Sequence, residues 1–162
     1  MPGRDRDPQG RARNARPRDA TGRPLPRAAA GAEQLPDDLD LTPAGSIARA
    51  QRLLDEGLPF PAHEVLEAAW KAAPDEQREL WRGLAQLAVG LTHLQRGNAR
   101  GAVALLSRAA ERIGTWIGPP PHDLDLDGLA AHAVDLAHHI ERDGVEAVGQ
   151  AEQRLRLRGR SP

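Results

Sequence analysis

Apolar residues recur at helical spacing along the central part of the chain. Thr42 is a favoured N-cap residue and Pro43 a favoured first helical residue, and an apolar period of three to four residues then runs from Ile47 to Leu54. Gly57 follows, and glycine suits the left-handed turn that commonly ends a helix. The pattern predicts a first helix over about 43–56.

The same period predicts four further helices. The second starts near residues 59–61 and ends where Pro74 forbids continuation, and the third ends at Gly97. The expected ranges are about 59–73, 75–97, 98–115 and 127–142, with a short sixth segment near 145–155.

Two parts of this pattern resemble each other. A shift of 40 positions aligns Leu54 with Leu94, Gly57 with Gly97 and Ala62 with Ala102. The first two helices and the next two therefore look like copies of one antiparallel hairpin, paired as in tetratricopeptide proteins although 40 residues is not that family's period. We predict an all-α fold, a compact bundle of five to six helices built from two antiparallel hairpins.

The amino-acid composition favours a helical fold and excludes several kinds of functional site. The 162 residues include one Phe, three Trp and no Tyr, so Leu, Ala, Val and Ile must build the core, which favours helices over a sheet. The chain has no cysteine, which excludes disulfides, a thiolate nucleophile and cysteine-based metal sites. A chain of this length supports one ordinary hydrophobic core, and we expect one domain.

Charge divides the chain into three parts. Residues 1–36 carry 8 basic and 4 acidic side chains, residues 37–150 carry 10 and 18, and residues 151–162 carry 4 and 1. The Arg- and Pro-rich segment 1–36 is predicted to be a disordered tail, 37–150 the helical domain, and 151–162 a basic tail whose alternating arginines find no partner strand. The acidic domain argues against a nucleic-acid-binding core and leaves only weak contacts of the tails with a polyanion.

The sequence predicts no association with a membrane. No apolar run approaches the roughly 20 residues that span a bilayer, and the first residues lack the apolar stretch of a secretory signal. We therefore expect a cytoplasmic protein.

The second predicted helix carries a polar stripe. His63, Glu67 and Trp70 lie at i, i+4 and i+7 and so share one face beside the apolar stripe. The hairpin fold does not require them, because the second copy has other residues at these positions. The equivalent residues are Val103, Ser107 and Ala110.

The third predicted helix supplies a facing polar wall. Gln86 and His93 lie seven residues apart. An antiparallel pairing about Pro74 puts Gln86 level with His63 and His93 further along, towards the ends of the first and fourth helices. Lys71 is the only lysine of the chain; it pairs with Glu67 at i, i+4, and the preference for an ammonium suggests a confined place or an anionic ligand.

Three interpretations of these residues remain open. His63, Glu67 and His93 could hold a divalent metal, with two ligands one helical turn apart. Alternatively, Glu67 or Glu64 could orient His63 as an acid–base group, although no nucleophile or oxyanion pocket is evident. Finally, a hydrogen-bonded network that includes Trp70 could simply fix the packing of two helices. The histidines at 132, 138 and 139 are expected on a solvated face of the fifth helix.

These residues resemble the bacterial and plastid family catalogued as domain of unknown function 309. The resemblance covers about residues 45–115 and implies a compact helical bundle, with candidate site positions at His63, Glu64, Glu67, Trp70, Gln86 and His93, but no reaction. Its motifs here read Phe60-Pro61-Ala62-His63-Glu64, Glu67, Trp70-Lys71, Gly83-Leu84-Ala85-Gln86-Leu87-Ala88, His93, Arg96-Gly97-Asn98 and Gly101-Ala102. The chain departs from the family pattern at Pro61.

Our leading hypothesis is a pocket between the second and third helices that binds a small ligand or a divalent metal. It includes hydrolase-type acid–base chemistry, with His63 and Glu67 as the catalytic pair. The alternative is a non-enzymatic helical module that binds a protein partner, in which the motif is structural. The sequence decides neither between them nor on the oligomeric state. The expected ligand contacts are Glu64, Trp70, Lys71, Gln86 and His93.

Overall fold

The structure is a computed structural model that describes residues 42–159; the predicted N-terminal tail lies outside the described residues. The predicted all-α fold is confirmed. Within residues 42–159, each helix begins and ends within a few residues of its expected bounds. The helices are α1 (Pro43–Asp55), α2 (Pro59–Ala72), α3 (Arg78–Gln95), α4 (Ala99–Gly114) and α5 (Leu126–Asp143), with short 3-10 turns at Asp75–Gln77, Pro121–Asp123 and Val145–Ala147.

The predicted duplication is visible in the two equivalent interhelical turns. Gly57 and Gly97 both adopt the left-handed conformation, with φ of 76° and 75°. The backbone N–H of Leu58 donates to the Leu53 carbonyl at 2.8 Å, and the N–H of Asn98 donates to the His93 carbonyl at 2.9 Å. The same turn therefore closes α1 and α3, 40 residues apart.

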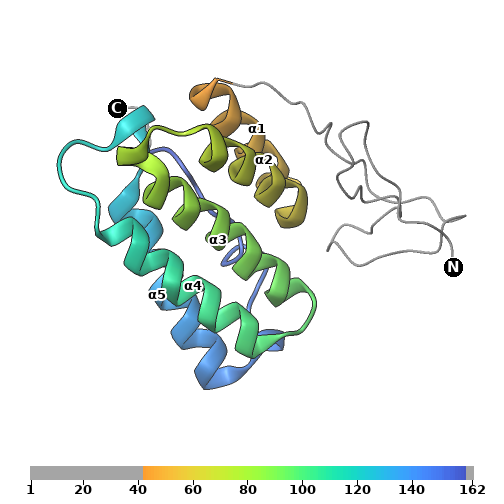
Figure 1. Cartoon of the computed structure of the whole chain (residues 1–162). Coiled ribbons are helices and arrows are strands. Elements are labelled where there is room, and N and C mark those ends of the chain that lie inside the picture. Colours follow the sequence, from red (N-terminus) through yellow and green to blue (C-terminus); the bar gives the residue numbers. More distant parts are fainter. Residues whose placement is uncertain (1–41, 160–162) are drawn as a thin grey trace, which may run out of the picture.

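Consecutive helices pack against each other along the array. α1 contacts α2, α2 contacts α3, α3 contacts α4, and α4 contacts α5 (Figure 1). The central helix α3 has buried residues on most of its surface, including Trp81, whose indole N–H donates to Gln77 Oε1 at 3.1 Å. No helix within the described range is long and apolar enough to cross a membrane.

Two glycines allow α3 and α4 to approach closely. A Cβ atom added at Gly90 would lie 2.8 Å from Leu106 Cγ, and one at Gly83 would lie 3.0 Å from Ile113 Cγ1. Both distances are shorter than ordinary van der Waals contact, so a side chain at either position would push the two helices apart.

The segment after α5 differs from the sequence prediction. Residues 151–162 were expected to form a basic tail beyond the domain, but Leu155 and Leu157 are 2% and 1% exposed and belong to the core. The segment runs back from the end of α5 and passes behind α3 toward α1 (Figure 1). Only residues 145–147 of the expected sixth helix are helical, as a 3-10 turn.

Hydrogen bonds on two sides hold this segment. The Gln51 side chain on α1 donates to the Leu155 carbonyl at 2.8 Å and accepts from the Leu157 N–H at 2.7 Å. On the other side, the N–H of Asp125 donates to the Leu157 carbonyl at 2.8 Å, beside an isolated antiparallel bridge between Leu124 and Arg158. The alternation of Arg and Leu thus marks extended chain whose partners are a helix side chain and a loop.

Candidate functional site

The polar stripe predicted on α2 forms a chain of contacts. His63 Nε2 lies 3.1 Å from Glu67 Oε2, and Glu67 Oε1 lies 3.4 Å from Lys71 Nζ. The Phe60 ring packs one turn before His63, with ring centroids 5.5 Å apart. The predicted Glu67–Lys71 pair is therefore present, although the Lys71 side chain is 68% exposed and not in the confined place that its identity suggested.

His63 is held in its neutral form. Burial lowers the pKa of its imidazole below the ordinary value of 6.5, and the Glu67 carboxylate and the Phe60 carbonyl offset only part of this effect. The Nδ1 atom is buried and has no hydrogen-bond partner of normal geometry among residues 42–159. His63 is thus a largely enclosed imidazole whose neutral form is favoured by burial.

Two contacts between α2 and α3 enclose the stripe. The Arg82 guanidinium lies 5.6 Å from the centre of the Trp70 ring, and that of Arg96 lies 5.9 Å from the centre of Phe60. Both are cation–π contacts, which hold the two helices together at each end of the stripe. We call the region between them the α2–α3 seam: Phe60, His63, Glu67 and Trp70 from α2, with Arg82 and Gln86 from α3 and its C-cap residue Arg96.

The two residues expected on the α3 wall lie in different surroundings. Gln86 is half-buried in the seam, and its Oε1 atom is buried without a hydrogen-bond partner in the described structure. His93 instead contacts the start of α4, where its Nδ1 lies 3.1 Å from Asn98 Nδ2 and its ring covers Gly101. Burial lowers the pKa of His93, and the charge of Arg96 adds to this effect.

The three residues expected to bind a metal, His63, Glu67 and His93, do not form a metal-binding group in the described structure. No three His, Cys, Asp or Glu side chains within residues 42–159 lie in an arrangement that could hold a metal ion. His63 and Glu67 contact each other, while His93 belongs to the turn between α3 and α4. Glu64, the other acidic candidate, is half-buried on α2.

Comparison with known proteins identifies the segment that carries the seam. Residues 47–105 match the family described as Domain of unknown function (DUF309). This segment is therefore similar to that family over about a third of the chain. The match confirms the resemblance noted from the motifs, and it spans α1 to the first part of α4.

The DUF309 segment is also similar to a protein of Bacillus subtilis (strain 168). The relative is described as Uncharacterized protein YpuF and is 43% identical over 51 residues. The matched region covers 31% of this chain and 29% of the relative, so the chain spans less than a third of that protein's length. No solved structure matches the chain.

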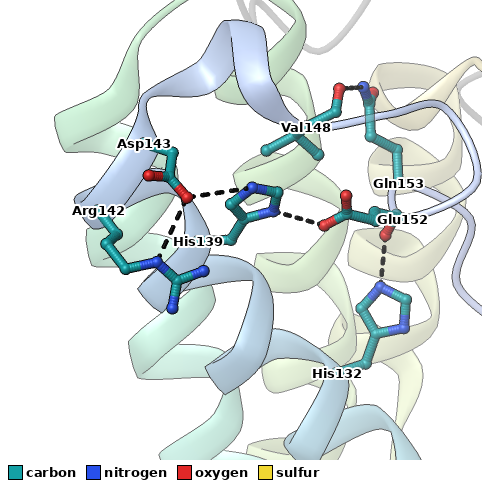
Figure 2. Close-up of polar contacts among 7 residues, drawn as sticks. All are labelled: His132, His139, Arg142, Asp143, Val148, Glu152 and Gln153. Carbon is teal, nitrogen blue, oxygen red and sulfur yellow. Dashed lines mark hydrogen bonds and ion pairs between the residues drawn. The ribbon is translucent and has the colours of Figure 1, made fainter.

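Outside the DUF309 segment, α5 carries a second cluster that the sequence prediction missed. His139 Nδ1 lies 2.6 Å from Glu152 Oε2, and its Nε2 lies 3.5 Å from Asp143 Oδ2, as Figure 2 shows. The ring of His132 contacts the Glu152 carbonyl. The hydrogen bond from His139 is the main reason that the pKa of the Glu152 carboxyl is lowered.

This cluster attaches the C-terminal segment to α5. Of the three histidines expected on a solvated face, only His138 is exposed. Glu152 follows His139 by 13 residues and arrives only because the chain turns back after α5. Helical spacing on α5 alone could not reveal it.

Proposed function

We propose that the α2–α3 seam binds a small polar ligand, with His63 as its proton-accepting group. The observation that carries the proposal is a pair of buried polar atoms on the two facing helices, His63 Nδ1 and Gln86 Oε1, which have no hydrogen-bond partner of normal geometry among residues 42–159. Leaving such an atom unpaired costs about 1–3 kcal/mol, so each favours a partner that completes it. A bound ligand is such a partner.

The hydrogen-bonding state of His63 indicates what the ligand must present. The Glu67 carboxylate lies against Nε2 and favours the tautomer with its proton on that nitrogen. In that tautomer Nδ1 is an acceptor, which the Phe60 carbonyl cannot satisfy because it also accepts, and Gln86 Oε1 is a second acceptor. The ligand that fits two acceptors carries two donors, such as a pair of hydroxyl or N–H groups.

The same geometry supports the acid–base chemistry expected from the sequence. A neutral imidazole can take a proton from a bound hydroxyl or water, and the Glu67 carboxylate stabilises the imidazolium that forms. Lys71 Nζ lies 3.4 Å from Glu67 Oε1 and helps to orient this carboxylate. This would be the general-base step of a hydrolase-type reaction in which His63 and Glu67 are the catalytic pair.

Nuclear magnetic resonance of the His63 ring tests the binding proposal. Ureas and vicinal diols, added at millimolar concentration to the full chain, are expected to shift the His63 Nδ1 resonance and the Gln86 side-chain amide together. Gln86→Leu removes one acceptor and should abolish the response at His63, while His132 on α5 is an internal control that should not shift. If no probe moves His63, or if Gln86→Leu responds as the unaltered chain does, the seam is a structural network.

The pKa of His63 should respond in opposite directions to two single substitutions. Glu67→Gln removes the charge that raises this pKa and should lower it further, whereas Lys71→Gln removes a charge that lowers it and should raise it. A titration of the ring resonances followed by NMR measures both.

The pH dependence of the free energy of unfolding should also reflect the lowered pKa of His63. The folded-state pKa lies below the ordinary 6.5, so the stability present above pH 6.5 is lost as the pH falls through the folded-state value. Glu67→Gln should enlarge this loss and Lys71→Gln should reduce it, as measured by urea unfolding at several pH values. Shifts of the His63 pKa in the same direction in both variants would show that the stripe does not act on His63 through its charges.

A further inference from the structure

We propose that a second site, between α1 and the C-terminal segment, binds a small organic phosphate. A cleft of about 790 Å³ lies there, within the size range of ordinary small-ligand sites. Its lining is apolar at Ile47 and Leu155 and basic around them. None of its lining residues belongs to the α2–α3 seam. The basic residues are Arg52, Arg154, Arg156 and Arg158.

The C-terminal segment that carries three of these arginines is anchored to the core and to α1. Leu155 and Leu157 are buried in the core, and successive side chains of an extended chain point to opposite sides, so Arg156 between them faces away from the core. The two hydrogen bonds of Gln51 hold this segment against α1. Arg52 follows Gln51 on α1 and lines the same cleft.

Within residues 42–159, the four arginines of the cleft outnumber its carboxylates. Among residues 42–159, Asp55 is the one carboxylate in its lining, and it accepts a hydrogen bond from Gln51 at 2.9 Å. No ion pair joins any of the four arginines to a carboxylate within residues 42–159. In the part of the chain that the structure describes, the Nε of Arg158 is buried without an acceptor, and this guanidinium makes a long 3.5 Å bond to the Ala44 carbonyl.

Several guanidinium groups around one hollow suit a phosphate. Each presents a planar set of donors that matches phosphate oxygens, and the apolar walls of a cleft strengthen the attraction. Asp55 argues against a long polyanion, because its carboxylate would repel a phosphate chain that passes through the cleft. It suits a small ligand that has a phosphate at one end and a hydroxyl or amino group at the other, such as a nucleotide or a sugar phosphate.

Calorimetry on the full chain tests this proposal with three probes at physiological ionic strength: ATP, glucose 6-phosphate and a single-stranded RNA oligonucleotide. We expect saturable binding of at least one of the two small phosphates. The pair Arg154→Gln and Arg156→Gln should weaken that binding by about tenfold or more, because hydrogen bonds to charged groups contribute strongly. Both side chains are exposed, so the variant should unfold at the same temperature as the unaltered chain.

The matched control is the pair Arg100→Gln and Arg108→Gln. These two exposed arginines lie on α4, away from the cleft, and their replacement changes the net charge equally. An equal loss in both variants would show non-specific attraction and overturn the proposal. The proposal would also be overturned if neither small phosphate showed saturable binding. Tighter binding of RNA than of either small phosphate would overturn it as well, because a polyanion would then be the ligand.

Discussion

Replacing Leu157 with alanine is expected to lower the free energy of unfolding by about 2–5 kcal/mol, the usual cost of truncating a fully buried leucine. Leu157 is 1% exposed, and its backbone N–H and carbonyl both form hydrogen bonds to other parts of the chain. The cavity left behind would be lined by the core of the helical array. Urea unfolding followed by circular dichroism measures the change.

Arg156→Ala is the control for this prediction. Arg156 is the exposed neighbour of Leu157 on the same segment, and its replacement should change stability by no more than about 0.5 kcal/mol. If the two variants were equally stable, the C-terminal segment would not be packed in solution. The phosphate site would then lose one of its walls.

Gly90→Ala is the second substitution with a large expected effect, a loss of about 1–3 kcal/mol from overpacking. The new Cβ would lie 2.8 Å from Leu106 Cγ and 3.3 Å from the Leu106 backbone nitrogen. A side-chain carbon can rotate away, but the backbone nitrogen moves only if α4 moves. Thermal unfolding of the variant measures the loss.

Gly114→Ala is the matched substitution at the end of α4. A Cβ there would meet nothing within 4 Å, so the alanine should be neutral or slightly stabilising. Equal destabilisation of both variants would show that loss of glycine, rather than the close approach of α3 and α4, determines the effect. A neutral Gly90→Ala would show that the two helices are not in close contact at Leu106.

The helices and one side of the candidate site could be predicted because they depend on neighbours in sequence. Thr42 and Asn98 accept hydrogen bonds from backbone N–H groups three residues ahead, as N-cap residues do, and Gly57 and Gly97 supply the left-handed turn. The contacts of His63 with Glu67 and of Glu67 with Lys71 follow from the helical period alone. Local geometry was sufficient for these features.

The other side of the site depends on distant contacts. Helical spacing placed Gln86 and His93 on one wall, but His93 contacts Asn98 and the start of α4, because the turn after α3 brings them against its ring. The sequence pattern could not show that the Nδ1 of His63 and the Oε1 of Gln86 are both buried without hydrogen-bond partners in the described structure. Burial of a single atom depends on how two helices pack.

The hydrophobic pattern alone therefore determined the all-helical fold, the repeated hairpin and the polar stripe of α2, because each is set by residues within a few positions of one another. Only the tertiary structure decided where the C-terminal segment lies. Its alternating Arg and Leu indicate extended chain, but its hydrogen-bond partner on α1, Gln51, is more than 100 residues away. That long-range contact buries Leu157 and brings the arginines beside α1, where they line the second proposed site.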